Sequence, residues 1–578
     1  MSDPKAAKAA KAAKAAAKAL RLSNNVWSIK YFAIAIGLIM VLFAVYHWSS
    51  VIHFHYGRRK NHPTLTRKYR QLQSLLSSSP MGLRTDRSLL YITYWAINLI
   101  LALTNLDFTI LVNVAKRFGW ISVANLVLLV FLALKNTPLA PLTATSYEML
   151  RPLHKGAGYT CIFTSVLHAI VYLSAWSQSG RLSKLEEVEN FAGGIAGIAM
   201  VIIGFSTITY FMRGYYELFY MLHIIMFLLI MITVGMHRPR FSTSTVIIII
   251  FTACLWVMDR IIRGAKILWN FFGNSLTVTA LPNNAIRVKL RRRMHSTPGS
   301  HAFLWVPAIR WVESHPFTLL SSNPSEFVIR VYDGFTQDLY KAAQASPGRS
   351  LRCSVDGAYG QVPNFKEFDK VVLVAGGSGA SFTFAIALDL IEASKKAAKS
   401  VDFIWIVRHQ ESLEWFSQEL KQLQTHPEVN VQIYVTRQTN LAGISPPTFS
   451  DSSSEKVFVK DDIVSAESSL VFSTNDPEKG VEQQSTDSIS SSVNQMLSGR
   501  PNIGNLIAAA ATGSGNLDDR VIVGACGPSK LMSTTREAVN DELLNGGPSI
   551  TLYTEDTMAP IRWSLVKRVG LTEHAQFA

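Results

Sequence analysis

The sequence predicts a multi-pass α-helical membrane domain followed by a β-barrel and an α/β domain. Three observations lead to this fold class. Apolar runs that are long enough to span lipid are concentrated before about residue 265. Short β-like runs separated by turns follow them, as in a small barrel. An apolar strand, a glycine-rich turn and an apolar helix-like run come next, which is typical of an α/β domain.

Composition narrows the class of protein. The chain has 578 residues, a formal net charge of +16 and a hydrophobic fraction of 48%, which is high for a wholly soluble protein of several domains. The basic residues are spread over loops that flank the apolar runs, rather than gathered in a groove with aromatic residues. We therefore attribute the charge to membrane topology and to contact with anionic lipid, and we exclude nucleic-acid binding. The four cysteines indicate neither a disulfide framework nor a CxxC metal site.

Residues 1–30 begin with an Ala/Lys repeat and are expected to form a basic tail. A helix on the membrane surface, a targeting segment and a disordered tail all fit this composition. We favour an uncleaved tail, because the hydrophobic run that follows is too long for a typical signal peptide and has no clear cleavage site.

Residues 31–265 are expected to form the membrane domain. Seven apolar spans are predicted, at about 31–52, 89–112, 120–135, 155–176, 192–212, 219–236 and 244–262. The odd-numbered loops and the stretch after the last span are richer in Lys and Arg than the other loops. The positive-inside rule therefore puts these loops and the C-terminal half in the cytosol. The lysine-rich N-terminus then lies outside, against the rule. In assigning the orientation we give the basic residues of the first loop more weight than those of the N-terminus.

Four histidines recur at matched spacing in the fourth and sixth spans. His154 and His168 are fourteen positions apart, and so are His223 and His237. On a helix this spacing is about 21 Å of rise and returns the side chain to within roughly 40° of the same face. A lone histidine in an apolar helix is more often a packing residue. The repeated spacing instead favours two haem groups, each with two axial imidazoles. Under the predicted topology His154 pairs with His223 near the cytosol, and His168 pairs with His237 near the far side.

Two stretches that lead into these helices, Asn136–His154 and Arg213–His223, resemble fungal ferric reductases. On these residues and on the motifs below, the chain resembles the ferric reductase and NADPH oxidase superfamily from about position 90 to position 558. Within it, the yeast metalloreductase-like branch of ferric/cupric reductase transmembrane components is the most similar. The resemblance implies two b-type haems and a ferredoxin-reductase-like module. This module comprises an FAD-binding β-barrel at residues 270–365 and an NADP-binding α/β domain at residues 369–558.

The flavin assignment follows from this resemblance. Residues 275–281 and 285–290 have the pattern of barrel strands. In the family a Pro-aromatic-Ser/Thr strand lines the flavin, which implies that role for His315, Pro316, Phe317 and Thr318. Residues 329–336 and 356–360 resemble the second flavin strand and the turn that ends the barrel, with Ala358 in place of a proline. Ordinary turns between strands are the alternative for both.

The nucleotide assignment begins with a strand, a glycine turn and a helix start. Such a turn lets the backbone approach phosphates, and the helix N-terminus offers free N–H groups. The spacing is not GxGxxG, but it resembles the GGxGxx loop of NADPH-binding ferredoxin reductase domains, with a plain strand-turn-helix as the alternative. The residues of this loop are Gly376, Gly377, Ser378 and Gly379.

Three further positions carry nucleotide roles by resemblance. Arg408 follows a strand, and its guanidinium suits the 2′-phosphate that distinguishes NADPH from NADH. Arg500 and Pro501 resemble the family's GRP motif. The turn beside the nicotinamide is matched by Cys526, Gly527 and Pro528. We expect Cys526 to help position the ring for hydride transfer rather than to act as a nucleophile.

The chain departs from the family pattern in two places. Residues 440–498 are Ser-rich and acidic, and we expect a disordered insertion that is a candidate for phosphorylation. Met558 stands where the family has an aromatic residue that stacks on the flavin, and a C-terminal tail of residues 559–578 follows. Trp563 or Phe577 in this tail is the alternative stacking residue.

The resemblance implies an NADPH-dependent ferric-chelate or cupric reductase that serves iron and copper homeostasis. Electrons would pass from cytosolic NADPH through FAD and two haem b groups to ferric or cupric chelates across the membrane. An NADPH oxidase that makes superoxide from dioxygen is the alternative. The predicted outer loops at 177–191 and 237–243 are short and leave little protein to cap the outer haem, and there is no EF-hand-like loop, so we favour the metalloreductase.

A channel or transporter is disfavoured, since it has no need of linked flavin-like and NADPH-like domains. We expect a multi-pass integral membrane protein of the plasma membrane, with the endoplasmic reticulum as the alternative.

Overall fold

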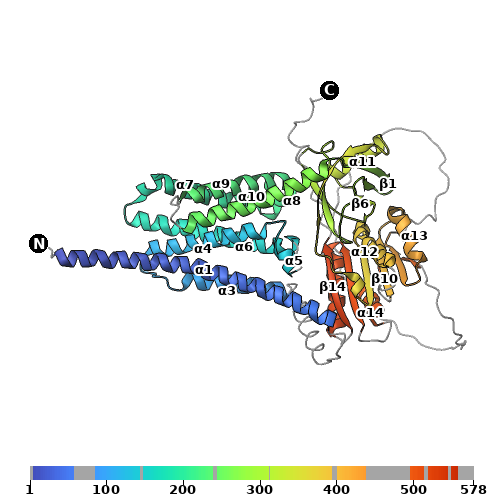
Figure 1. Ribbon diagram of the computed structural model, residues 1–578, viewed down its shortest axis with the longest axis horizontal. Helices are drawn as coiled ribbons and strands as arrows, with labels where there is room; N and C mark the ends of the chain where they lie inside the picture. The colour runs from blue at the N-terminus through green and yellow to red at the C-terminus, as the bar shows by residue number, and fades with distance from the viewer. Residues whose placement is uncertain are drawn as a thin grey trace, which may run out of the picture.

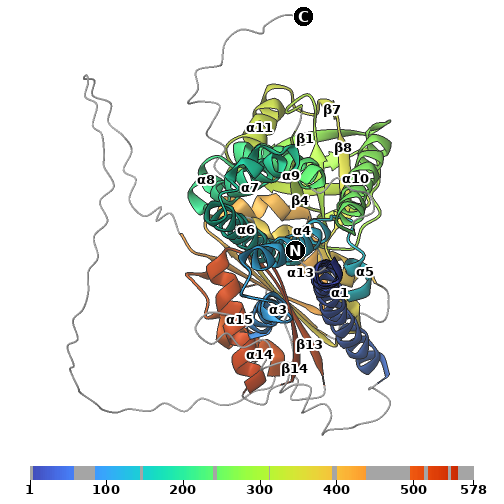
Figure 2. The same ribbon diagram turned by 90° about the vertical axis from the view of Figure 1, so that its left-hand side faces the viewer.

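The computed structural model describes residues 4–56, 85–143, 147–237, 244–311, 313–393, 400–437, 495–512, 519–544 and 548–556. Figure 1 shows a bundle of long helices at one end of the molecule and the strands at the other. Figure 2 looks along the bundle and shows the sheets lying behind it. The predicted architecture, a domain of long apolar helices followed by a β-barrel and an α/β domain, is confirmed.

The bundle consists of long apolar helices whose outward side chains are exposed. In the described residues six helices are long and apolar enough to cross a membrane, and α3 is a shorter apolar helix. The long helices are α1 Pro4–Tyr56, α4 Leu111–Leu132, α6 Tyr147–Gln178, α7 Val188–Ser206, α9 Tyr216–His237 and α10 Ser244–Phe271. Helices α3 Thr85–Leu103, α5 Leu139–Thr143 and α8 Thr209–Gly214 are shorter.

The predicted second span, 89–112, is wrong at its C-terminal end. Helix α3 ends at Leu103, and residues 105–112 are divided between a turn and the start of α4. Asn105 adopts a left-handed conformation with φ 52°, and the Asp107 carboxylate accepts a hydrogen bond from the Thr109 backbone N–H at 3.1 Å. Asn and Asp side chains favour such turns over helix, and hydropathy alone does not register this.

Helix α1 crosses the boundary that was expected near residue 30. It runs from Pro4 to Tyr56, so the Ala/Lys repeat and the first apolar run share one helix. Ala and Lys are both good helix formers, which allows the helix to continue through the basic stretch. Its middle packs on the bundle through Phe32, which is buried with Tyr94 and Ala124.

The barrel contains two antiparallel sheets, with strand orders β5-β6-β2-β1-β7 and β4-β3-β8. The two strands expected at 275–281 and 285–290 are confirmed as β1 and β2. Leu276, Val278, Ile286 and Val288 alternate with half-buried or exposed positions and fill the barrel core. The elements are β1 Ser275–Leu281, β2 Ala285–Leu290, β3 His301–Trp305, β4 Ser314–Thr318, β5 Ser321–Ser322, β6 Ser325–Arg330, α11 Phe335–Ala345, β7 Ser350–Arg352 and β8 Ser354–Tyr359.

The α/β domain is built on a parallel six-stranded sheet of order β12-β11-β10-β9-β13-β14. Strand β9 is buried along its whole length, as helices on both faces require. The strand order reverses between β9 and β13, which makes their carboxyl ends a topological switch point. The strands are β9 Lys370–Gly376, β10 Ser400–Val407, β11 Val429–Val435, β12 Gln495–Ser498, β13 Arg520–Gly527 and β14 Ser549–Asp556. The helices are α12 Ala380–Glu392, α13 Ser417–Thr425, α14 Ile503–Thr512 and α15 Ser529–Leu544.

The predicted insertion at 440–498 ends too late. Its last four residues form β12, which pairs in parallel with β11. Residues 438–494 lie outside the described residues, as do Met558 and the predicted tail with Trp563 and Phe577.

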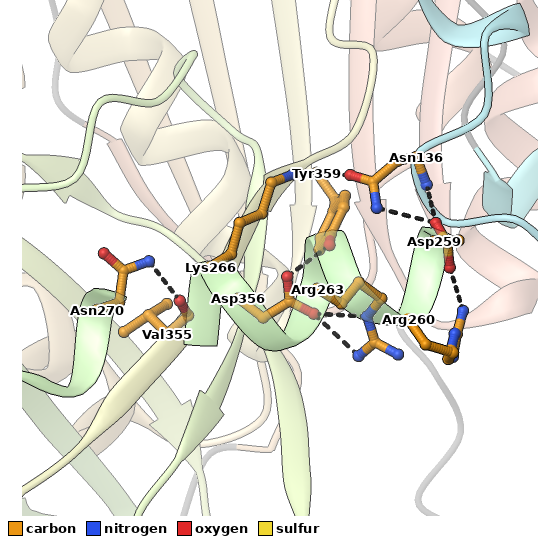
Figure 3. Close-up of polar contacts among 9 residues, drawn as sticks. All are labelled: Asn136, Asp259, Arg260, Arg263, Lys266, Asn270, Val355, Asp356 and Tyr359. Carbon is orange, nitrogen blue, oxygen red and sulfur yellow. Dashed lines mark hydrogen bonds and ion pairs between the residues drawn. The ribbon is translucent and has the colours of Figure 1, made fainter. Parts of the chain in front are cut away.

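Polar contacts connect the three parts, and two of these joints are built on arginines. At the first, α10 continues beyond the bundle, and the Arg263 guanidinium binds the Asp356 carboxylate of β8 at 2.9 Å (Figure 3). At the second, Arg287 of β2 contacts both oxygens of the Glu419 carboxylate on α13, at 2.8 and 3.0 Å. Arg287 also binds Glu326 of β6 at 2.8 Å, so it joins the barrel to the α/β domain.

We predict that Arg287→Ala weakens the joint between the barrel and the α/β domain. Two carboxylates lose a charged hydrogen-bond partner, which costs about 2–3 kcal/mol. This corresponds to a fall of roughly 5–10 °C in the midpoint of thermal unfolding. Lys289→Ala is the matched control, since Lys289 lies on the same strand, 3.5 Å from Glu326, and is mostly exposed. Equal midpoints for the two variants would contradict the joint.

Candidate functional sites

The two histidine pairs predicted from the spacing lie together in the structure. The ring centroids of His154 and His223 are 6.3 Å apart, and those of His168 and His237 are 6.2 Å apart. The first histidine of α6 pairs with the first histidine of α9, and the second histidines of the two helices also pair. Helices α6 and α9 therefore run in the same direction. Within the described ranges no three His, Cys, Asp or Glu side chains gather as a metal-ion cluster, so the histidines stand as two separate pairs.

The geometry of each pair suits two axial ligands of one iron. A metal–imidazole nitrogen bond is about 2 Å long, so rings on opposite sides of one metal have centroids about 6 Å apart. The Nδ1 atoms of His154, His168 and His237 lie 3.0, 2.7 and 2.8 Å from the carbonyl oxygens of Leu129, Ala115 and Glu189. A carbonyl only accepts, so Nδ1 carries the hydrogen and Nε2 keeps its lone pair for a metal.

His223 differs from the other three histidines. It is partly buried, and its Nδ1 has no hydrogen-bond partner among the described residues. Its ring lies beside Phe219, one turn earlier on α9, with centroids 5.6 Å apart. Contact with its own helix and with His154 therefore holds this ring, rather than a bond to a neighbouring helix.

Two glycines that the sequence reasoning missed make room for the outer pair. A Cβ at Gly119 of α4 would lie 2.7 Å from His168 Nδ1, and a Cβ at Gly193 of α7 would lie 2.5 Å from His237 Nδ1. Each glycine is four residues after the carbonyl that the same imidazole binds, Ala115 or Glu189. Each imidazole therefore packs against the backbone of the neighbouring helix, at a position where glycine has no side chain. The sequence shows a glycine in each of these apolar helices. Only the packing of the helices shows which histidine each glycine contacts.

The predicted flavin strand β4 presents its residues on two faces. His315 stacks on Phe335 with centroids 4.5 Å apart, and Phe317 lies 6.2 Å from the same ring. Phe335 is buried in the barrel core, so this face packs inward. Side chains alternate along a strand, so Pro316 and Thr318 lie on the other face.

The second face of β4 continues across the three-stranded sheet. His301 of β3 pairs with Thr318 on one side and with Tyr359 of β8 on the other. The Tyr359 hydroxyl donates to Asp356 at 2.6 Å, so the predicted turn at 356–360 belongs to the same surface. The two flavin motifs are therefore neighbours, with β3 between them.

The two predicted nucleotide loops touch at the switch point of the α/β sheet. A Cβ at Gly379 would lie 2.4 Å from the Cys526 carbonyl oxygen, and one at Gly527 would lie 3.0 Å from the Gly376 backbone nitrogen. A Cβ at Gly376 would lie 2.7 Å from Pro528. Only glycines permit this approach, and the free space beyond it is where ligands bind in open α/β sheets.

The remaining nucleotide residues lie along the same carboxyl edge. Gly377 and Ser378 form a 3-10 turn between β9 and α12. Arg408 is exposed directly after β10, while Arg500 and Pro501 follow β12. Strand β11 separates β10 from β12, so the two arginines share an edge without being adjacent.

A charged cluster that the sequence reasoning missed lies where the three parts meet. His301 Nε2 is 2.8 Å from Glu148 of α6, and His301 Nδ1 is 3.9 Å from Glu555 of β14. Glu555 pairs in register with Cys526. Burial raises the pKa of the Glu555 carboxyl to about 7. No sequence pattern joins residues from three domains, so only the fold reveals this cluster.

Comparison with known proteins agrees with this architecture. Residues 118–234 match the ferric reductase like transmembrane component, and residues 271–363 match an FAD-binding domain. Residues 368–540 match the ferric reductase NAD binding domain. The chain is similar to the ferric reductases in all three parts. The barrel is therefore an FAD-binding module, and the α/β domain is an NAD-binding module.

Individual relatives are fungal. The probable cell surface ferric reductase kap2 of Aspergillus oryzae is 28% identical over 339 residues, which cover 53% of this chain and 45% of that protein. Ferric/cupric reductase transmembrane component 1 of Candida albicans is 26% identical, covering 62% and 48%. Ferric reductase transmembrane component 3 of Saccharomyces cerevisiae is 24% identical, covering 77% and 61%. The chain spans about half the length of the first of these relatives.

Among solved structures, a ferredoxin NADP+ reductase from Neisseria gonorrhoeae aligns with 49% of this chain and 98% of its own, at 15% identity and a TM-score of 0.32. That score is too low to bear on function, and the assignment of the two modules rests on the strand order and the family matches.

We predict that Gly379→Ala abolishes nucleotide binding. The added Cβ would collide with the Cys526 backbone and push the two loops apart. Affinity for NADP+, measured by calorimetry on the flavin-loaded protein, should fall at least tenfold while flavin absorbance is retained. Gly504→Ala on α14 is the control, because its Cβ would meet only the end of the Asn502 side chain, at 3.3 Å. Unchanged affinity in Gly379→Ala would contradict the site.

Proposed function

We propose that this protein is an NADPH-dependent reductase that passes electrons through FAD and two haem groups to ferric or cupric chelates on the far side of a membrane. One observation carries the proposal. Two imidazole pairs, each with centroids a little over 6 Å apart, are stacked along α6 and α9 of a chain that also has FAD-binding and NAD-binding modules.

The four histidines are the proposed haem ligands. His154 and His223 hold the inner group, and His168 and His237 hold the outer one. The fit rests on the ring separations and on the three Nδ1–H bonds to carbonyls, which put the ring hydrogen on Nδ1 and leave Nε2 as the nitrogen that would bind a metal. When bound, haem supplies one-electron transfer, and FAD links this to the two-electron chemistry of NADPH.

The nucleotide residues take the roles that their places allow. The glycine loop with Ser378 lets the backbone approach the phosphates, and the start of α12 offers N–H groups to them. Arg408 binds the 2′-phosphate with its planar guanidinium, which makes NADPH the preferred donor. Arg500 and Pro501 border the same edge. Cys526, Gly527 and Pro528 hold the nicotinamide, and Cys526 orients the ring for hydride transfer.

The arrangement of these sites implies a direction of electron flow. Glu148 at the start of α6 touches the barrel, and His154 follows within two turns. His168 and His237 lie toward the opposite end of the same helices. Electrons that enter at the nucleotide edge therefore leave at the outer pair. With the positive-inside topology, the entry side is the cytosol of a cell whose plasma membrane is the proposed location.

A metal chelate is the proposed acceptor because the described connection that leaves α6 beyond His168 is short and exposed. The described connection between α6 and α7 is short, with a single 3-10 turn at Leu182–Glu186. Its side chains are exposed, including Arg181 and Glu186. A chelate needs such access to a haem edge, whereas dioxygen needs only a small closed pocket.

The acceptor is tested by ferric-chelate reduction with purified protein in vesicles, driven by NADPH, with and without superoxide dismutase. We expect the rate to be unchanged by the dismutase, because metal receives electrons directly. A rate that collapses with the dismutase would mean that superoxide is the product, and the NADPH oxidase alternative would replace our proposal.

We also predict that Gly193→Ala removes the outer haem alone. Its Cβ would displace the His237 ring, which lies within 2.5 Å, and break the bond to Glu189. Haem content should fall from two to one per chain, and ferric reduction should fall at least tenfold. NADPH-driven flavin bleaching should persist. Gly197→Ala, one turn later on α7 with nothing within 4 Å, is the control and should retain both haems. Two haems in Gly193→Ala would refute the outer site.

A further inference from the structure

His301 occupies the point where the membrane helices, the barrel and the α/β domain meet. It is the first residue of β3, and it is largely buried. Its Nε2 lies 2.8 Å from Glu148 of α6, and its Nδ1 lies 3.9 Å from Glu555 of β14. One titratable ring therefore faces a carboxylate from each of the two other parts.

The surroundings of His301 place it at the flavin surface. It pairs with Thr318 of the first flavin motif and with Tyr359 of the second. Its second carboxylate neighbour, Glu555, is in register with Cys526 at the proposed nicotinamide site. Two buried oxygens beside it, Ser300 Oγ and Glu555 Oε2, have no hydrogen-bond partner among the described residues. Buried polar atoms are rarely left in this state, so a polar ligand edge fits here.

Other charged and titratable groups also border this cluster. Lys135, in the connection after α4, lies 3.2 Å from the Phe303 ring centroid, and burial lowers its pKa to about 7. Tyr147 of α6 and Tyr359 of β8 place their rings 6.4 and 6.2 Å from His301. Burial raises the pKa of the Glu555 carboxyl to about 7, a charged His301 lowers that pKa, and the Glu148 carboxylate raises it.

Under the proposed function, oxidation of NADPH releases a proton at the flavin surface, and this proton must reach solvent. In that reaction, a hydride from NADPH would bring two electrons and one proton to bound flavin. If the haem that His154 and His223 would hold takes the two electrons singly, one proton per NADPH is left on the flavin side. The overall change is NADPH to NADP+, one proton and two electrons. A buried site needs a group that accepts this proton and delivers it to water.

We propose that His301 is this proton acceptor, with Glu148 balancing the charge that it gains and Glu555 exchanging the proton with solvent. The inference rests on the proposed electron path. The Glu148 carboxylate lies 2.8 Å from Nε2, where it can balance the charge of the added proton, while Glu555 lies 3.9 Å from Nδ1, on the other side of the ring.

The test separates hydride transfer from electron transfer. His301→Gln keeps a hydrogen-bonding side chain but cannot hold a proton near neutral pH. In anaerobic stopped flow, flavin reduction by NADPH should stay within about twofold of wild type. The later reduction of haem should slow at least tenfold and lose its solvent deuterium isotope effect and its pH dependence near 7. The control is His295→Gln, an exposed histidine in the loop after β2, which should behave as wild type.

A second measurement needs no turnover. The infrared band of the protonated Glu555 carboxyl, assigned by its loss in Glu555→Gln, should titrate near pH 7 in the resting protein. It should titrate at higher pH in His301→Gln, because the imidazole, which lowers the pKa of Glu555 whenever it carries a proton, is gone. If His301→Gln does not retain FAD, Glu555→Gln takes its place in the kinetic test with the same expected slowing.

The outcomes are distinguishable. Wild-type protein in which NADPH bleaches flavin but never reduces haem would overturn the proposed function. Wild-type protein that reduces haem, with His301→Gln matching its rate and pH profile, would overturn the proton role alone. An unmoved Glu555 titration in His301→Gln would do the same.

Discussion

The ion pair between Arg263 and Asp356 is the contact on which the rest of the molecule depends. Arg263 belongs to the C-terminal part of α10, and Asp356 opens the turn of β8 that the second flavin motif occupies. Both groups are largely buried, with side-chain exposures of 14% and 2%. Removing either partner would leave the other charge buried and unpaired, which would destabilise the folded protein. The pair therefore sets where the barrel stands relative to the membrane helices.

Further bonds around this pair make the joint rigid, as Figure 3 shows. Asn270 donates to the Val355 carbonyl at 2.7 Å, so α10 and β8 meet again two turns later. Lys266 donates to Asn136 at 2.7 Å, and Asn136 donates to Asp259, which brings the loop after α4 onto α10. With α10 tied to β8 on one side and to that loop on the other, Tyr359 and His301 are held close to the start of α6. The joint therefore keeps the surface of the two flavin motifs beside the helix that carries His154.

Particular residues show which features of the structure the sequence predicts and which it does not. The fourteen-residue spacing of the histidines follows from helix periodicity, so both pairs were predictable before any packing was known. The strand, glycine turn and helix around Gly376 were predictable because they are local, while the phosphate and nicotinamide roles of Gly376 and Cys526 stay predictions that rest on the resemblance. The break after Leu103 was not, because a hydropathy window averages over the short turn at Asn105. Strand β12 was hidden for a related reason, as four residues at the end of a polar stretch carry too little pattern to register.

The sequence by itself determined the order of domains, the two histidine pairs and the local turns, because periodicity and turn chemistry act within one helix or loop. The tertiary structure alone decided which glycines seat the imidazoles, which face of β4 is free, and that the two nucleotide loops touch. It also brought Glu148, His301 and Glu555 together from three domains. Contacts of this kind depend on how separate elements pack, and the chain carries no local signal for a partner that lies hundreds of residues away.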